Sequence, residues 1–417
     1  MKQIPLICLV VFIFTSCMDD VMLPIPDFGT SGLISETNQL SDSSKQRLEA
    51  IFNVLEGNAA FGDQIVAKWN GNYLSIYTSV SMNYMILQAG YLDSVVIFEG
   101  YWRNALNTQT GLIRLTIKKN EGGKELIYEQ TPPTTMILRG SYGEGSNLPN
   151  FRLAFQFIKP LKKETTNFWI IGHRGGGRTS DKLPVSENSL GMLQLAERFG
   201  CNAVEIDVRL SSDRVPVLFH DEFVSSRLVN SDFMIGPIAS YTFKQIRTYC
   251  TLKDGSQIPT LREALDVIIY KTNLSLVWLD TKPRNIMDLL IPIQKEYMQK
   301  AKDAGRTLEI MIGLPDPDIL NDFLNHPDHA NALALCELGT GDVRKANAKI
   351  WAPRWTLGTL NPDVEEMHRE NVRAFVWTLD NPDFIHVYIT DGKFDGILTN
   401  YPSKVAWEYY MKRNYYE

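Results

Sequence analysis

Two histidines stand directly after apolar runs and could transfer protons near neutral pH. His173 follows FWIIG (168–172), and His220 follows VPVLF (215–219). Imidazole titrates closer to neutrality than any other unperturbed side chain, so a pair of histidines can provide one general base and one general acid. The alternative for each is a hydrogen-bonded core histidine. Two histidines at strand ends, with acidic residues nearby, favour catalysis.

Three carboxylates are spaced so that they could hold a cation together. Glu205 and Asp207 are two residues apart in AVEIDV (203–208), so both side chains would leave the same face of one strand. Asp280 ends LSLVWLD (274–280), and Lys282 would share its face. Carboxylate oxygens are hard ligands, and therefore we expect Mg²⁺ or Ca²⁺ rather than zinc.

These polar residues follow different segments of one repeating pattern. Between residues 168 and 399, short apolar runs alternate with mostly helical text, and the eight runs are FWIIG, AVEIDV, LSLVWLD, TLEIMIGL, ALALCEL, AKIWAPR, NVRAFVWTL and FDGILT. Eight β/α units over about 240 residues predict a closed parallel TIM (β/α)8 barrel, an α/β fold. Catalytic groups of such barrels lie at the carboxyl ends of the strands, which is where the polar residues fall.

The segment before the barrel is predicted to be an all-β domain. Residues 45–158 contain short aromatic and β-branched runs, such as YLSIYTSV and SVVIFEGYW, separated by Gly and Asn. This texture predicts a small antiparallel sandwich or barrel of unknown role. Its aromatic residues Trp69, Tyr101 and Trp102 are expected to fill the core, with a glycan or lipid ligand as the alternative. Residues 159–167 form a charged linker, and the barrel occupies 168–417.

The N-terminus has the pattern of a secretion signal. MKQIPLICLVVFIFTSC carries Lys2, an apolar run and small residues before Cys17, which predicts a signal peptide over 1–16. The ending resembles a bacterial lipobox, so Cys17 is expected to be lipidated and residues 17–44 to form a tether. A plain cleavage near Ser16 with a free Cys17 is the alternative. The expected location is that of a secreted lipoprotein, in an outer membrane and facing the periplasm or the cell surface.

Charge and cysteine spacing exclude two classes of function. The chain of 417 residues has a formal charge of −6 and contains no run of Lys or Arg, which argues against a nucleic-acid partner. Cys201, Cys250 and Cys336 are widely spaced without a CxxC pair, so neither a zinc site nor a disulfide framework is expected. We expect these three cysteines to be small buried apolar residues.

The ordered motifs of the barrel resemble those of the glycerophosphodiester phosphodiesterase family over about residues 170–405. The matching stretches are HRG (173–175), EN (187–188), EIDVRLSSDRVPVLFHD (205–221), IPTLREAL (258–265), LDTK (279–282), VWT (376–378) and FDGILTNYP (394–402). The resemblance implies a TIM barrel, a divalent cation and cleavage of a phosphodiester by two histidines. HRG alone would be a weak signal, whereas the ordered set is specific.

Residue by residue, the resemblance implies a role for each matched position. His173 and His220 match the acid–base pair, and the metal ligands would be Glu205, Asp207 and Asp280. The residues expected around the phosphate and the histidines are Arg174, Glu187 and Lys282. Positive charge there would neutralise the nonbridging oxygens. Gly175–Gly177 would let the backbone approach the phosphate, Asp221 would orient His220 or cap a turn, and Trp377 would either bind glycerol carbons or fill the core.

Two positions depart from the family pattern. Asp280 stands where the family usually has Glu, which affects the choice of metal. Asn400 stands where Asp is common, and we expect this change to alter only a loop contact.

The leading hypothesis is hydrolysis of glycerophosphodiesters to glycerol 3-phosphate and an alcohol, by water or by the glycerol hydroxyl as nucleophile. The alternatives are phospholipase-like cleavage of a lipid phosphodiester on the same barrel and a non-catalytic lipoprotein that binds a glycan or lipid. An N-terminal lipid anchor is compatible with all three.

Overall fold

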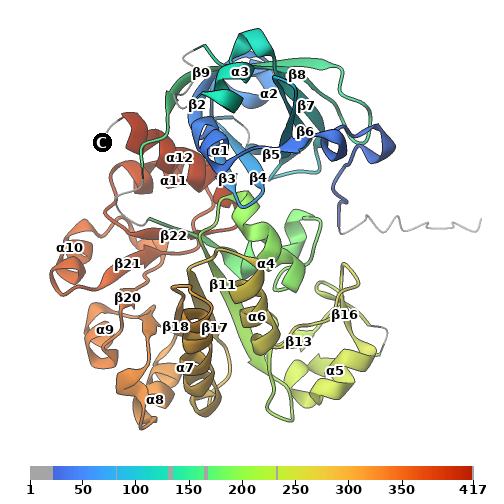
Figure 1. The fold of residues 1–417 in the computed structure, drawn as a ribbon. Helices are drawn as coiled ribbons and strands as arrows, with labels where there is room; N and C mark the ends of the chain where they lie inside the picture. The colour runs from blue at the N-terminus through green and yellow to red at the C-terminus, as the bar shows by residue number, and fades with distance from the viewer. Residues whose placement is uncertain (1–21, 81, 130–134, 164–167, 232, 416–417) are drawn as a thin grey trace, which may run out of the picture.

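Two barrels of different kinds follow one another along the chain (Figure 1). The computed structural model describes residues 22–80, 82–129, 135–163, 168–231 and 233–415. The predicted signal peptide, Cys17 and residues 164–167 of the predicted linker therefore lie outside the described residues.

The N-terminal domain is a closed antiparallel barrel. Its strands are β2 (Ala50–Glu56), β3 (Gln64–Asn70), β4 (Tyr73–Thr78), β5 (Asn83–Leu92), β6 (Val95–Asn104), β7 (Thr110–Ile117), β8 (Ile137–Tyr142) and β9 (Phe151–Pro160). Each strand pairs with the next, and β9 returns to β2. Buried rings of Phe52, Phe98, Trp102 and Phe155 fill the interior, as expected for a barrel of this size. Of the two predicted architectures, the barrel is therefore the one formed.

Short elements complete this domain. Helices α1 (Asp42–Leu48), α2 (Asn58–Phe61) and α3 (Gly123–Tyr128) connect or precede its strands, and β1 (Asn38–Gln39) pairs with the end of β5. Within the predicted tether, the backbone N–H groups of Leu33 and Ile34 donate to the buried Glu99 carboxylate of β6 at 2.7 and 3.2 Å. Residues 33–39 therefore contact the barrel wall.

The C-terminal domain is the TIM barrel that the sequence predicts. Its strands are β10 (Trp169–Gly172), β11 (Ala203–Leu210), β17 (Leu276–Thr281), β18 (Glu309–Leu314), β19 (Ala334–Cys336), β20 (Ile350–Trp351), β21 (Arg373–Val376) and β22 (Gly396–Thr399). All pair in parallel, and β22 closes the ring by pairing with β10. Side chains such as Ile171, Met311 and Phe375 pack inside the ring.

Helices surround this ring, as Figure 1 shows. They are α4 (Leu190–Ala196), α6 (Leu261–Lys271), α7 (Met287–Asp303), α8 (Pro317–Asn325), α9 (Thr340–Ala346), α10 (Asn361–Arg369), α11 (Pro382–Thr390) and α12 (Pro402–Tyr415). Local sequence fixes several starts. Thr260 and Glu263 form a capping box at α6, and Asp316 accepts two backbone N–H bonds before Pro317 at the start of α8.

A small lobe leaves the barrel after β11. Strand β12 (Pro216–Leu218) folds back antiparallel to β11, and β13 (Phe223–Val224), β14 (Val229–Asn230), β15 (Gly236–Pro237), α5 (Phe243–Tyr249) and β16 (Thr251–Leu252) follow. These elements enclose their own apolar cluster, which includes Phe219, Leu228 and Ile246. We call residues 221–252 the lobe.

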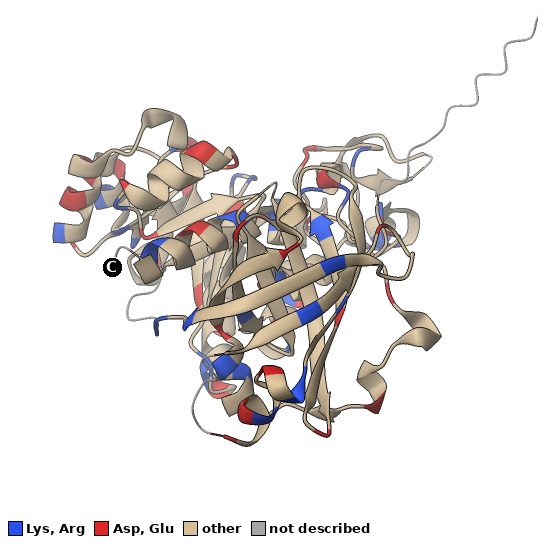
Figure 2. Ribbon diagram, turned by 90° about the horizontal axis from the view of Figure 1, so that it is seen from above, with Lys and Arg blue, Asp and Glu red and all other residues tan. Residues whose placement is uncertain are grey.

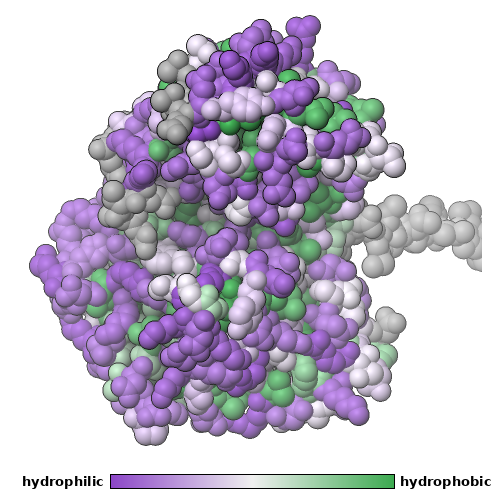
Figure 3. Space-filling model, viewed as in Figure 1, coloured by the Kyte–Doolittle hydropathy of each residue, from purple (hydrophilic) through white to green (hydrophobic). Residues whose placement is uncertain are grey.

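The two domains share a packed apolar junction. Tyr77 of β4 stacks on Tyr410 of α12, with ring centroids 6.4 Å apart, and Tyr84 of β5 meets Phe199 edge-on at 5.6 Å. On the face drawn in Figure 3, the surface is largely hydrophilic and apolar side chains are visible at the seam between the domains. Aromatic pairs of this kind hold a fixed orientation as well as burying area.

The remaining sequence expectations concern cysteines and surface properties. Cys201, Cys250 and Cys336 are buried free thiols, as predicted. Seen from above, acidic and basic residues are intermixed over both domains (Figure 2). Among the residues that the structure describes, every helix is too short or too polar to cross a membrane.

Candidate active site

The residues predicted to do chemistry meet at the carboxyl ends of the barrel strands. A cavity of about 450 Å³ opens there. Its lining includes His173, Arg174, Glu205, His220, Asp280, Lys282 and Trp377. His173 follows β10 directly, while β12 carries His220 back toward the same rim from the far end of β11.

The three acidic residues form one cluster because two neighbouring strands carry them in register. Asp207 of β11 pairs directly with Asp280 of β17, and Glu205 lies two residues before Asp207. One oxygen from each carboxylate lies within 4.8 Å of the others. Asn188 fixes Asp207 by donating from Nδ2 to Oδ2 at 2.8 Å and by accepting the backbone N–H of Asp207.

This cluster carries more negative charge than its surroundings neutralise. Burial and the neighbouring Asp207 raise the pKa of Glu205 well above its ordinary value, and burial raises the pKa of Asp280. Burial opposes the ionisation of Asp207 as well, but the nearby Lys282 ammonium outweighs it and lowers the pKa. Lys282 Nζ lies 3.0 Å from Asp207 Oδ1 and also contacts Asp280. The Lys282 ammonium thus contacts two of the three carboxylates.

A divalent cation fits this donor set. Glu205 Oε1 is buried and has no hydrogen-bond partner among the described residues. A buried carboxylate oxygen without a partner is costly, and a hard cation held by three carboxylates would remove that cost. Glu205, Asp207 and Asp280 are therefore the residues that would hold it.

His173 is held by an amide at its Nδ1. Asn400 Oδ1 lies 2.8 Å from His173 Nδ1, so the ring N–H is assigned to Nδ1 and Nε2 is left as an acceptor. Asp380 in turn accepts from Asn400 Nδ2 at 2.7 Å and from its backbone N–H at 2.8 Å. Burial, with a smaller contribution from the Arg174 charge, lowers the pKa of His173 to about 4.

The expectation that Asn400 alters only a loop contact is therefore wrong. Gly172, the last residue of β10, pairs with Thr399, the last residue of β22. The residues that follow them, His173 and Asn400, therefore lie side by side. The neutral amide orients the imidazole without adding a charge next to it.

His220 is held by a carboxylate. Asp221 Oδ1 lies 2.8 Å from His220 Nδ1, so Asp221 orients the ring. Burial opposes the ionisation of Asp221, but hydrogen bonds from Arg227 and His220 outweigh it and lower its pKa to about 2. Arg174 Nη2 donates to His220 Nε2 at 2.8 Å, so the Nε2 lone pair faces the Arg174 guanidinium.

Arg174 connects both histidines to the acidic cluster. Its backbone adopts φ 53° and ψ 36°, an uncommon conformation for a residue with a side chain. In this conformation its N–H donates to Glu205 Oε2 at 2.7 Å, and its Nη1 donates to Glu187 Oε1 at 2.8 Å. Glu187 is 1% exposed, so this buried carboxylate fixes the position of the Arg174 guanidinium.

The cavity lining also contains the predicted Trp377, together with Arg354, Glu337 and Trp278, which sequence reasoning missed. The Arg354 guanidinium lies over the Trp377 ring, 4.7 Å from its centroid, in a cation–π contact. Trp377 Nε1 also donates to Ala352 O at 2.7 Å. Glu337 Oε1 and Trp278 Nε1 are buried without hydrogen-bond partners among the described residues. Glu337 directly follows β19, so the strand-end rule applied to ALALCEL points to it.

Arg227 was missed for a different reason. It lies in the lobe and contacts both Asp221, at 2.6 Å, and Glu187, at 3.4 Å, so it joins the supports of the two halves of the site. Its surroundings have no periodic pattern that would have predicted this position.

The model of the glycerophosphoryl diester phosphodiesterase family matches residues 173–404, which is more than half of the chain. This chain belongs to that family. The match begins at the first catalytic candidate, His173, and spans every residue of the cavity named above.

Named relatives agree with this assignment. Glycerophosphodiester phosphodiesterase 1 of Rattus norvegicus is 33% identical over 154 residues, which are 34% of this chain and 42% of the relative. The chain thus spans less than half the length of that relative. A glycerophosphodiester phosphodiesterase of Caldanaerobacter subterraneus subsp. tengcongensis is 25% identical over 244 residues, 56% of this chain and 94% of the relative.

Two solved structures are similar to part of the chain. A glycerophosphodiester phosphodiesterase from Parabacteroides distasonis matches with a TM-score of 0.48 and 21% identity, over 60% of this chain and 100% of that one. An Oleispira antarctica phosphodiesterase in complex with the product sn-glycerol-3-phosphate matches with a TM-score of 0.46 and 20% identity, over 57% and 95%.

Proposed function

We propose that this chain hydrolyses glycerophosphodiesters to glycerol 3-phosphate and an alcohol, in a reaction that depends on a divalent cation, Mg²⁺ or Ca²⁺. The observation that carries the proposal is that two oriented histidines line one cavity at the strand ends together with Glu205 and Asp280 of the three-carboxylate cluster. Family membership supports the same reaction class. The substrate is a small molecule that carries a phosphodiester.

The two histidines suit opposite halves of a proton-transfer reaction. His173 has a lowered pKa and its Nε2, 3.9 Å from Glu205 Oε2, is the acceptor nitrogen, so it is neutral near pH 7 and suits the role of general base. The ionised Asp221 orients the His220 ring through Nδ1, which leaves Nε2 for the role of general acid to the leaving alkoxide. The base can serve water or the neighbouring hydroxyl of the glycerol, and both remain open.

Charge neutralisation is the other requirement for attack on an anionic diester. Arg174 and Lys282 both line the cavity and would contact the nonbridging oxygens. When bound, the cation would supply Lewis-acid stabilisation of charge on those oxygens. Arg174 must then exchange its contact with His220 for one with substrate. That exchange would free His220 Nε2 for the proton it delivers.

The wall formed by Trp377, Glu337 and Trp278 would hold an organic part of the substrate. Trp377 offers a ring face to glycerol carbons, and the unpartnered Glu337 Oε1 and Trp278 Nε1 offer an acceptor and a donor. This supports a hydroxyl-bearing moiety such as glycerol at this wall.

The test is turnover of glycerophosphocholine by the purified chain and its variants. We expect His173→Ala and His220→Ala to lower kcat/KM by roughly a hundredfold to ten-thousandfold, the range of general acid–base catalysis. His326→Ala is the matched control, because His326 lies at the end of α8 and outside the cavity lining. Full activity in either cavity variant would overturn the assignment of that histidine.

A second candidate function is cleavage of an intact lipid phosphodiester. It is favoured by large apolar side chains on the surface of the lobe, where Phe233 is 64% and Ile235 is 81% exposed. The same lobe carries Asp221 and Arg227, so a lipid surface that contacts it would lie beside the site. Vesicles of intact phospholipid and the deacylated headgroup, tested in parallel, separate the two functions by which substrate turns over.

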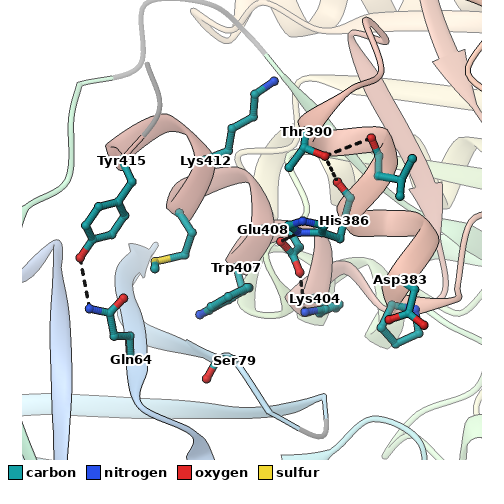
Figure 4. A pocket seen from close by; sticks show the side chains of 13 residues that line it. Gln64, Ser79, Asp383, His386, Thr390, Lys404, Trp407, Glu408, Lys412 and Tyr415 are labelled. Atoms are coloured by element: carbon teal, nitrogen blue, oxygen red, sulfur yellow. Dashed lines mark hydrogen bonds and ion pairs between the residues drawn. The ribbon is translucent and has the colours of Figure 1, made fainter.

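A non-catalytic binding role remains the third hypothesis, with a glycan or lipid as ligand of the β domain. Trp102 is buried in the barrel core, whereas Tyr101 is largely buried but lines a groove of about 660 Å³ beside Tyr73 and Arg198. A groove of about 760 Å³ between the domains offers another place (Figure 4). There Gln64 of β3 donates to Tyr415 OH at 3.2 Å, near Trp407 and Glu408 of α12. A glycan array with wild type and Trp407→Ala tests this ligand.

We also propose that Cys17 is lipidated and anchors the enzyme to an outer membrane, facing the periplasm or the cell surface. The support is the signal-like N-terminal sequence alone. Two measurements test this proposal, namely incorporation of labelled palmitate and recovery of the protein in the membrane fraction. We expect Cys17→Ser to lose both. Release of unlabelled wild-type protein into the medium would contradict it.

A further inference from the structure

One arginine of the β domain donates hydrogen bonds to the backbone of the C-terminal domain, in the segment that follows His173 and Arg174. Arg103 lies near the end of β6 and is 2% exposed. Its Nη2 donates to the carbonyl of Asp181 at 3.2 Å and also to the carbonyl of Lys182. We call residues 173–183 the catalytic loop. It contains His173, Arg174, Gly175–Gly177 and the two residues whose carbonyls Arg103 contacts.

Thr179, in the second half of the catalytic loop, is hydrogen-bonded to Glu187, the residue that holds the Arg174 side chain. Thr179 donates its backbone N–H to Glu187 Oε2 at 2.8 Å, and its hydroxyl accepts the Glu187 backbone N–H at 3.1 Å. Glu187 Oε1 accepts from Arg174 Nη1 at 2.8 Å. A continuous set of hydrogen bonds therefore runs from Arg103 through the turn at 179–182 to Arg174.

The glycines of the loop rest on the same junction. A Cβ at Gly177 would lie 2.5 Å from Leu183 Cδ1, and one at Gly176 would lie 3.1 Å from Met192 Sδ. Leu183 and Met192 belong to one apolar cluster with side chains of the β domain, among them Tyr84, Ile86 and Tyr101. The wall under the glycines is thus built partly from the N-terminal domain.

We propose that the β domain, through Arg103 and this apolar cluster, positions the catalytic loop and is a structural part of the active site. Arg103 is a positioning residue, since it contacts the loop backbone and lies outside the cavity lining. The loop carries His173 and Arg174, whereas the carboxylates stand on β11 and β17. Loss of the Arg103 contacts should therefore disturb the histidine and arginine more than the acidic cluster, in which only Glu205 accepts a hydrogen bond from the loop, from the Arg174 N–H.

The test compares Arg103→Met with wild type and with Arg139→Met, a control whose guanidinium pairs with Glu121 inside the β domain. We expect faster hydrogen–deuterium exchange of amides 173–183 in Arg103→Met. We also expect kcat on glycerophosphocholine to fall about tenfold to a hundredfold, because small displacements of catalytic groups cost that much. Mg²⁺ affinity by calorimetry should change much less than kcat, because Asp207 and Asp280 stand on β11 and β17, and the control should match wild type throughout.

The activity readout rests on the proposed function, whereas amide exchange reports the loop independently of it. If wild type has no activity, the proposed function fails and exchange alone decides the role of Arg103. Wild-type exchange and kcat in Arg103→Met would overturn the proposal. So would a parallel loss of melting temperature, Mg²⁺ affinity and kcat, which indicates general destabilisation. If Arg103→Met does not fold, Arg103→Gln, which keeps a polar but shorter side chain, takes its place with the same outcomes.

Discussion

Replacing Asn400 by Asp tests how the structure orients His173. Asn400 is 5% exposed, and its Nδ2 lies 2.7 Å from Asp380 Oδ2. In Asn400→Asp a second carboxylate oxygen takes the place of that amide nitrogen. Two unit charges at this separation repel by about 6 kcal/mol at an effective dielectric constant of about 20. Protonating one carboxyl of ordinary pKa costs less, about 4 kcal/mol at pH 7, so this route sets the loss of stability.

The sign of the pH dependence follows from this proton. The folded variant binds one proton more than the unfolded chain above the ordinary carboxyl pKa, so its stability falls as pH rises. We expect a loss of about 4 kcal/mol at pH 7 and about 1.5 kcal/mol at pH 5, relative to wild type. Urea unfolding at both pH values measures this difference in the free energy of unfolding.

A matched double variant provides the control. Asp380→Asn combined with Asn400→Asp keeps one amide and one carboxylate with their positions exchanged, so we expect most of the stability to return. If Asn400→Asp unfolds at the same urea concentration as wild type at pH 7, the orientation of the Asn400 amide toward Asp380 is refuted.

Further predictions concern the metal and the cavity walls. Glu205→Gln removes a buried carboxylate from the acidic cluster, and we expect calorimetric Mg²⁺ and Ca²⁺ binding to weaken at least tenfold; unchanged affinity would exclude Glu205 as a ligand. Trp377→Ala should raise KM for glycerophosphocholine several-fold with little change in kcat, because it removes contact area that does not take part in proton transfer; a kcat effect alone would contradict this. Glu337→Gln should reduce discrimination between glycerol-containing and glycerol-free diesters, measured as the ratio of kcat/KM values, and an unchanged ratio would remove Glu337 from substrate recognition.

Much of the site could be predicted because the chemistry repeats at one kind of position. A parallel barrel brings all strand ends to one rim, so His173, Asp207 and Asp280 could be grouped without knowing any contact. The alternation of Glu205 and Asp207 on one strand face also follows from strand geometry alone. These are local rules applied at each strand end.

Other parts depend on contacts between distant segments. The role of Asn400 follows from the closure of the ring between β22 and β10, which pairs residues 227 positions apart. Arg227 acts from a lobe without periodic sequence, and Arg103 acts across a domain boundary. Pairing of this kind has no signature within a single segment.

The most direct test of the account is release of glycerol 3-phosphate from glycerophosphocholine by the purified chain, before and after removal of divalent cations. The account predicts turnover that chelation abolishes and that Mg²⁺ or Ca²⁺ restores in wild type, and that neither ion restores in His220→Ala. Turnover that persists after chelation, or that survives unchanged in His220→Ala, would contradict it.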